Sequence, residues 1–342
     1  MTRLLAFDSG IGGLGIVREL RRQLPDVPVD YLADTALFPY GEVPDHLLVP
    51  RIVSLVEAAI RRFEPDAVVV ACNTASTLAL GALRERIALP VVGCVPPIKW
   101  AAERSRTRHI GLLATSATVR RAYLHELRER FAPDCTLVAH GARHLADVAE
   151  RVFRGAAPDE ALVRRELRLL FDQPGGERVD VVGIGCTHYS FLLEPLRRLS
   201  PPGTLWLDPA EAVARRAAAV LAAAGHAVPA GGGEGGPAGR DGGDQHVRGD
   251  AGRNEAPDTA ANGAAGSRAG AAPRTGGGSA TEHGPRSGGT RPGHTGNAHR
   301  PPAGSDAAGR AWFTAEPPER DAVRAGLEAY GYRELEPFSV PG

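Results

Sequence analysis

Two cysteines occupy matching positions in two similar stretches of this 342-residue sequence. AVVVACNTAS (67–76) and VVGIGCTHYS (181–190) are aliphatic runs that end in Cys72 and Cys186, each followed by polar side chains. A cysteine thiol has a pKa of about 8.5, so neighbouring groups can hold it as thiol or as thiolate near neutral pH. Inverting a carbon centre requires one group that removes a proton from one face and another that returns a proton to the opposite face. The paired contexts therefore predict two opposed acid/base thiols.

Further polar side chains stand at the ends of other apolar runs. In an open parallel sheet, ligands bind beyond the carboxyl ends of the strands, where loops and helix N-termini present free N–H groups. A small zwitterion with a carboxylate suits these donors, and the glycines of DSGIGG allow the backbone to approach it closely. We expect Asp8 to assist proton transfer at Cys72 and His188 to assist it at Cys186. Beside the two cysteines, the polar set is Asp8, Ser9, Asp34, Asn73, Thr74, Thr115, Ser116, Thr118, Thr187 and His188.

Simpler explanations exist for each of these features. A cysteine at the end of an apolar strand is usually a small core residue. We expect this for Cys94 and Cys135. Taken singly, either Cys72 or Cys186 could also be such a core residue. His188 can be a structural histidine. No second pair of ligands has suitable spacing, so no metal site is predicted. GxGxxG is absent in the dinucleotide arrangement, so a nicotinamide cofactor has little support.

Short apolar runs alternate with longer helical patterns along residues 4–224, which is typical of a parallel α/β fold. Helices are predicted over about residues 14–24, 49–63 and 211–224. LLAFDSG at the start also resembles LLATSAT at 112–118, which adds a second pair to the cysteine repeat. The fold class is therefore α/β, with two similar three-layer domains, mainly parallel sheets and an active site in the cleft between them. We expect residues 1–95, 208–229 and 311–342 in the first domain and 96–207 in the second.

Residues 230–310 have a different composition. Gly, Ala, Pro, Arg, Ser and Asp dominate there, and Val247 is the only large aliphatic residue. Nine arginines stand against eight acidic residues, so the stretch is not a basic arm. This composition predicts a disordered insertion. Beyond it, AWFTAEPPERDAVRAGLEAYGYRELEPF predicts a short strand, an amphipathic helix and a final apolar stretch.

Whole-chain properties narrow the class of function. Forty basic residues balance forty acidic ones, so nucleic acid and anionic membranes are not expected partners. No run reaches about 18 apolar residues, and the first residues enter a strand directly, so we expect a cytoplasmic protein without a signal peptide. The four scattered cysteines are expected to be free thiols. Lys99 is the only lysine and lies outside the cysteine motifs, which argues against pyridoxal phosphate.

Four motifs together resemble the glutamate racemases of the aspartate/glutamate racemase family. They are DSGIGG (8–13), ADTALFPYG (33–41), ACNTAS (71–76) and GCTHYS (185–190), in this order. The resemblance covers about residues 3–225 and resumes in WFTAEPPERDAV near the end. It implies two similar α/β domains, interconversion of L- and D-glutamate without a cofactor, a supply of D-glutamate for peptidoglycan, and a homodimer.

The resemblance also implies roles for individual residues. Cys72 would act on the D enantiomer and Cys186 on the L enantiomer, assisted by Asp8 and His188. Substrate contacts would come from Asp8, Ser9, Tyr40, Gly41, Asn73, Thr74, Thr187 and His188. Supporting positions would be Asp34 and Glu150, and Thr115 and Thr118 are further supporting candidates because of their place at a strand end. The sequence departs from the family pattern at Ser190, where proline is common, and at Pro209, where serine is common; neither replaces a proton carrier.

Other functions stay open at this point. Related racemases for aspartate and hydantoins share the paired cysteines, so an aspartate or broad-specificity racemase is one alternative. The depth of the carboxylate pocket would distinguish them. A non-catalytic regulatory protein that acts on DNA gyrase is another, although two intact motif cysteines argue against it. The insertion could also be a partner-binding segment, which deletion of residues 231–309 would test.

Overall fold

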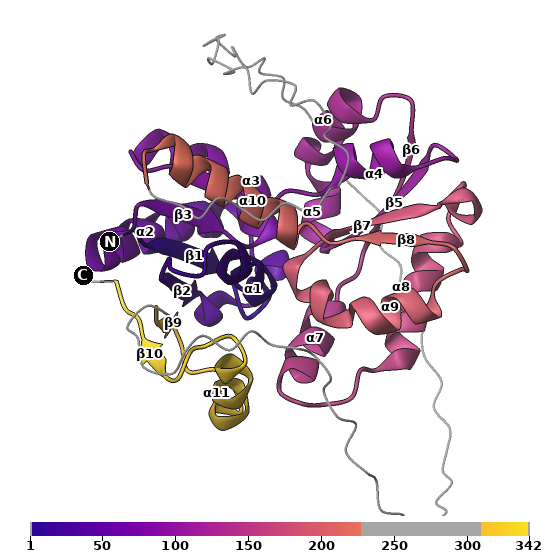
Figure 1. Cartoon of the computed structure of the whole chain (residues 1–342). Helices are drawn as coiled ribbons and strands as arrows, with labels where there is room; N and C mark the ends of the chain where they lie inside the picture. Colours follow the sequence, from indigo (N-terminus) through magenta and orange to yellow (C-terminus); the bar gives the residue numbers. More distant parts are fainter. Residues whose placement is uncertain (1, 227–308, 341–342) are drawn as a thin grey trace, which may run out of the picture. The chain divides into compact units, whose positions relative to one another are not determined.

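Two parallel β-sheets organise the chain in a computed structural model that describes residues 2–226 and 309–340 (Figure 1). All these residues belong to one compact unit. The six-stranded sheet has the order β10-β9-β2-β1-β3-β4 and the four-stranded sheet the order β6-β5-β7-β8. The strands of the first are β1 (Leu4–Asp8), β2 (Val29–Ala33), β3 (Ala67–Val70), β4 (Val91–Gly93), β9 (Ala311–Phe313) and β10 (Leu335–Pro337). Those of the second are β5 (His109–Ala114), β6 (Thr136–Gly141), β7 (Val181–Gly185) and β8 (Leu205–Leu207).

The two sheets repeat one topology. The order β2-β1-β3-β4 in the first sheet is matched by β6-β5-β7-β8 in the second, and every pairing is parallel. Cys72 follows β3 closely and Cys186 follows β7 directly, so the two cysteines end equivalent strands. The predicted fold of two similar α/β halves is confirmed. Only the first sheet has extra strands, β9 and β10, which come from the segment after residue 308.

Helices cover both faces of each sheet because side chains of a buried strand alternate between the faces. Leu4 and Ala6 of β1 pack with one apolar cluster, whereas Leu5 and Phe7 pack with another. On the first face lie α1 (Leu14–Gln23), α10 (Ala210–Ala223) and α11 (Arg320–Glu328), and on the second α2 (Asp45–Phe63) and α3 (Asn73–Arg86). The four-stranded sheet has α7 (Leu145–Phe153), α8 (Glu160–Phe171) and α9 (Leu193–Leu199) on one face and α4 (Ile98–Arg104) and α6 (Ala122–Phe131) on the other. Shorter segments are η1 (Thr35–Leu37), η2 (Tyr40–Glu42), α5 (Ser116–Arg120), η3 (Gly176–Arg178) and η4 (Thr187–Leu192).

One detail differs from the sequence prediction and another completes it. The helix expected from about residue 49 begins at Asp45 and contains Pro50. A proline has no N–H and favours the first turn, which is why the pattern suggested a later start. The final apolar stretch forms β10, which extends the sheet by pairing with β9.

The described residues stop at His226 and resume at Gly309, and both points lie at the amino ends of strands in the six-stranded sheet. His226 Nδ1 lies 3.4 Å from Oγ1 of Thr2, just before β1. The backbone N–H of Arg310 donates to Oδ1 of Asp30 at the start of β2. The insertion predicted at 230–310 lies outside the described residues except for its last two. Along 2–226 and 309–340, no helix combines the length and apolar character needed to span a membrane.

Candidate active site

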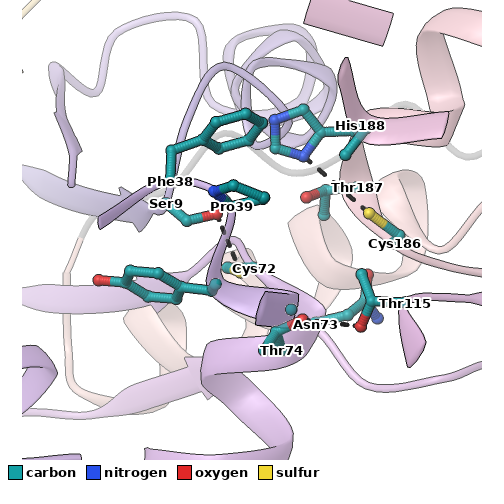
Figure 2. Close-up of a pocket in the computed structure, with 13 residues that line it drawn as sticks. Ser9, Phe38, Pro39, Cys72, Asn73, Thr74, Thr115, Cys186, Thr187 and His188 are labelled. Atoms are coloured by element: carbon teal, nitrogen blue, oxygen red, sulfur yellow. Dashed lines mark hydrogen bonds between the residues drawn. The ribbon is translucent and has the colours of Figure 1, made fainter. Parts of the chain in front are cut away.

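A small pocket collects residues that follow strands of both sheets (Figure 2). Its free volume is about 20 Å³, which is roughly the space of one water molecule. Ten of its lining residues were predicted from the sequence: Ser9, Tyr40, Gly41, Cys72, Asn73, Thr74, Thr115, Cys186, Thr187 and His188. Phe38, Pro39 and Ala146 also line it and were not singled out. The pocket is thus formed by strand ends of both halves.

Four predicted residues lie one layer behind the lining. Each is hydrogen-bonded to a residue of the pocket wall. The contacts are Asp8 to Thr187, Asp34 to Tyr40, Glu150 to His188, and Thr118 to Thr115. Asp8 and Asp34 are fully buried. The structure therefore brings these site residues to one place in two layers, whereas Ser116 donates to the carbonyl of Gly141 and does not line the pocket.

Cys72 stands at the N-cap of α3, which presents free N–H groups to its side chain. Its Sγ accepts a hydrogen bond of 3.5 Å from the backbone N–H of Ala75. The hydroxyl of Ser9 lies 3.7 Å from the same sulfur. Asp8 lies behind Ser9, and its Oδ1 accepts from the N–H and hydroxyl of Ser9 and from the N–H of Gly10. Ser9 is therefore the polar side chain beside this sulfur.

The electrostatics on this side favour the thiol. Burial raises the pKa of Cys72 well above its usual value, and the charge of Asp8 raises it further, while the N–H of Ala75 and the hydroxyl of Ser9 oppose the rise. Burial also raises the pKa of Asp8, opposed by His188 and by the hydrogen bonds from Gly10 and Ser9. These surroundings keep Cys72 in its thiol form.

His188 links the second cysteine to a carboxylate. Its Nδ1 lies 4.0 Å from Cys186 Sγ, and its Nε2 lies 3.2 Å from Oε1 of Glu150. The ring of Phe38 packs against it, with centroids 5.2 Å apart. Burial alone would lower the pKa of His188, but Cys186, Glu150 and Asp8 outweigh burial and raise the pKa well above its usual value. The imidazolium form places a donor toward the sulfur and another toward Glu150.

Two hydrogen bonds join the walls of the pocket across the two sheets. Thr187 Oγ1 donates to Asp8 Oδ2 at 3.1 Å, and the hydroxyls of Thr74 and Thr115 lie 3.1 Å apart. The close approach depends on Gly12, because a Cβ at that position would lie 2.5 Å from Nδ1 of His188. The sequence analysis expected these glycines to let the backbone approach a ligand, whereas Gly12 makes room for His188 and Thr187 of the other half.

One polar atom in the pocket has no partner. Asn73 donates through Nδ2 to the carbonyl of Cys94, while its Oδ1 is buried without a hydrogen bond. A buried amide oxygen in this state is costly, and an ammonium group of a ligand would satisfy it.

The pocket lining offers acid/base groups and hydroxyls. Within the described ranges, no group of three or more His, Cys, Asp and Glu side chains could hold a metal ion. Lys99 is exposed at the start of α4 and is not among the lining residues. All four cysteines are free thiols, as predicted, and all four are buried. Cys94 and Cys135 are the two outside the pocket lining.

The family model for Asp/Glu/Hydantoin racemase matches residues 16–217, which is more than half of the chain. The chain belongs to this racemase family. A glutamate racemase of Granulibacter bethesdensis is 57% identical over 217 residues, which are 64% of this chain and 78% of the relative. One of Brucella ovis is 47% identical over 221 residues, which are 64% and 80% of the two chains.

Solved racemase structures agree. An Escherichia coli glutamate racemase, in complex with L-glutamate and the activator UDP-MurNAc-Ala, superposes with a TM-score of 0.72 at 31% identity, covering 100% of this chain and 99% of the other. A Thermus thermophilus glutamate racemase has a TM-score of 0.62 at 25% identity, covering 99% and 96%. The predicted enzyme class of a glutamate racemase is therefore confirmed.

Some residues around the pocket escaped the sequence analysis for identifiable reasons. Phe38 and Pro39 lie inside the ADTALFPYG motif, whose apolar members are the sequence signal for them. Ala146 reaches the wall through the packing of α7, which no local pattern reveals. Arg51 and Thr314 hold Asp34 from distant parts of the chain.

Proposed function

We propose that this racemase interconverts L-glutamate and D-glutamate by moving a proton between the α carbon and two thiols, Cys72 and Cys186. One observation carries the proposal: the two cysteines end equivalent strands of the two sheets and line a single pocket. A carbon bound between them would have one sulfur for each face.

In the L-to-D direction, the thiolate of Cys186 takes the α proton, and the electron pair left on carbon is delocalised into the adjacent carboxylate. The thiol of Cys72 then delivers its proton to the opposite face. Cys186 ends as thiol and Cys72 as thiolate, so the enzyme is ready for the reverse reaction. Exchange of these protons with water restores the starting state. The raised pKa of Cys72 keeps its sulfur protonated before this step, as the mechanism requires.

The remaining polar groups suit the two ends of the amino acid. The unpartnered Oδ1 of Asn73 can accept from the substrate ammonium. Hydroxyls of Thr74, Thr115 and Thr187, with the free N–H groups at the start of α3, can donate to carboxylates. His188 lies beside Cys186, and Asp8 accepts a hydrogen bond from Thr187, the neighbour of Cys186. Both groups place charge close to the cysteines.

Binding requires the pocket to open, because its free volume of about 20 Å³ does not hold an amino acid. The hydrogen bonds between Thr74 and Thr115 and between Asp8 and Thr187 tie opposite walls. They have to give way as the walls separate. We also infer that the chain works as a homodimer and supplies D-glutamate for peptidoglycan, in line with its similarity to glutamate racemases.

A racemisation assay without added cofactor tests the proposal. The purified chain is incubated with L-glutamate or L-aspartate, and both enantiomers are quantified by chiral chromatography. We expect conversion of L-glutamate to an equal mixture and little conversion of aspartate. The Cys72→Ser and Cys186→Ser variants should each lose at least about a hundredfold in rate, because a hydroxyl is a far weaker acid than a thiol.

Cys135→Ser is the matched control, since this cysteine is also buried but lies outside the pocket. It should keep the parent rate. Parent activity in either pocket variant would show that the cysteine concerned carries no proton.

A further inference from the structure

We propose that Thr314, which lies beyond the insertion, is a positioning residue of the racemase pocket that acts through Asp34 on Tyr40. The inference rests on the proposed function, because it assigns to a distant segment the task of holding the substrate-binding wall. Thr314 follows β9 directly.

Asp34 is the centre of the contact. Its carboxylate is fully buried and receives four hydrogen bonds. Oδ1 accepts from Nη2 of Arg51 at 2.5 Å and from Oγ1 of Thr314 at 2.6 Å. Oδ2 accepts from Nε of Arg51 at 2.6 Å and from the hydroxyl of Tyr40 at 2.7 Å. A buried carboxylate is stabilised by such donors. The loss of one donor therefore destabilises the carboxylate and alters its hydrogen bonds to the remaining donors.

Thr314 also ties down the loop that follows β2. Its backbone N–H donates to the carbonyl of Ala33 at 3.1 Å, and its Oγ1 accepts from the N–H of Ala36 at 3.1 Å. The next residue repeats the pattern, since Thr35 Oγ1 donates to the carbonyl of Ala315 at 2.7 Å. The partners Thr314 and Asp34 are 280 positions apart in the sequence. Two consecutive residues of the last segment therefore fix the start of this loop.

The same loop forms one wall of the pocket. Phe38, Pro39, Tyr40 and Gly41 all line it, and Phe38 packs on His188. Burial and the adjacent Asp34 raise the pKa of Tyr40 well above its usual value, so its hydroxyl stays protonated and keeps donating to Asp34. The side chain of Tyr40 is thereby held at one orientation. Thr314, Asp34 and Tyr40 form a chain of contacts from the end of β9 to the wall of the pocket.

The first test compares Thr314→Val, which removes the hydroxyl at nearly constant shape, with Thr314→Ser, which keeps it. We expect Thr314→Val to raise KM for both enantiomers about five- to tenfold with kcat changed by less than about twofold, a fraction of what a hydrogen bond to a charged group is worth. Thr314→Ser should restore the parent KM. If Thr314→Val does not fold, Thr314→Ala gives the same readout with a smaller side chain. Thr136→Val, at the exposed start of β6, is the matched control and should match the parent.

A double-mutant cycle with Tyr40→Phe tests the route of the effect. If Thr314 acts through Asp34 on Tyr40, Thr314→Val should raise KM by less than about 1.5-fold in the Tyr40→Phe background, since coupled residues are not additive. Full additivity, an unchanged KM in Thr314→Val, or a Thr314→Ser variant as impaired as Thr314→Val would each overturn the inference. A parent that does not racemise glutamate would instead overturn the proposed function. If the parent is active and the Thr314 variants behave otherwise than expected, only the inference about Thr314 fails.

Discussion

Thr187 Oγ1 donates a hydrogen bond of 3.1 Å to Oδ2 of Asp8, although Asp8 ends β1 of the six-stranded sheet and Thr187 follows β7 of the four-stranded sheet. Thr187 is the neighbour of Cys186, and Asp8 lies behind Ser9 on the Cys72 side. The charge of Asp8 raises the pKa of both Cys72 and His188. One carboxylate therefore influences a titratable group on each side of the pocket.

Replacing Asp8 by Asn should lower kcat/KM by about a hundredfold or more. The amide keeps the shape of the side chain but removes the negative charge that acts on Cys72 and on His188. Steady-state kinetics with either enantiomer would measure the loss. Asp134→Asn serves as the control, since Asp134 is exposed and pairs with Arg108 away from the pocket. A fall of less than about threefold in Asp8→Asn would show that the charge is not needed.

His188 should make the folded protein more stable at acidic than at alkaline pH. Its folded-state pKa lies above the unfolded value of about 6.5. The stability gained from this proton is fully present below the unfolded pKa and is lost as the pH rises through the folded pKa. The difference in unfolding free energy between the parent and His188→Asn should therefore be larger at low pH. Urea unfolding at about pH 5.5 and pH 9 would measure it; a difference that is equal or larger at pH 9 contradicts the assignment.

Activity should survive Lys99→Arg without added pyridoxal phosphate. A pyridoxal enzyme holds its cofactor as a Schiff base on a lysine, and this chain has Lys99 alone, exposed on α4. The variant should racemise at the parent rate. Loss of activity, together with an aldimine absorbance in the parent that the variant lacks, would contradict the cofactor-free mechanism.

Replacing residues 231–306 by a Gly-Ser linker of about ten residues should leave kcat and KM within about twofold of the parent. His226 and Arg310 both contact the amino ends of strands in the six-stranded sheet. The pocket lies at the carboxyl ends, and ten residues span up to about 33 Å. Chiral assay of the folded variant would measure the effect. A folded variant without turnover would assign a catalytic task to the replaced segment.

The sequence predicted the parts of the site that are encoded locally. A strand that ends in cysteine and is followed by polar residues fits within ten consecutive residues. Two such segments in the sequence located Cys72 and Cys186. The contact between Thr314 and Asp34 is of another kind. It exists because β9 pairs with β2, and strand order between segments 280 positions apart leaves no local pattern. The ring of Phe38 on His188 likewise depends on how the two halves meet.

Isotope incorporation at the α carbon tests the two-thiol mechanism most directly. The parent enzyme is given unlabelled L-glutamate in D₂O, and both enantiomers are separated at low conversion and analysed by mass spectrometry. With two opposed thiols, one takes the substrate proton and the other delivers a solvent-derived deuteron. The D-glutamate formed should carry one deuterium at the α carbon, while the recovered L-glutamate keeps its protium. D-glutamate that retains the original proton, or L-glutamate labelled as fast as product forms, would show that a single group serves both faces.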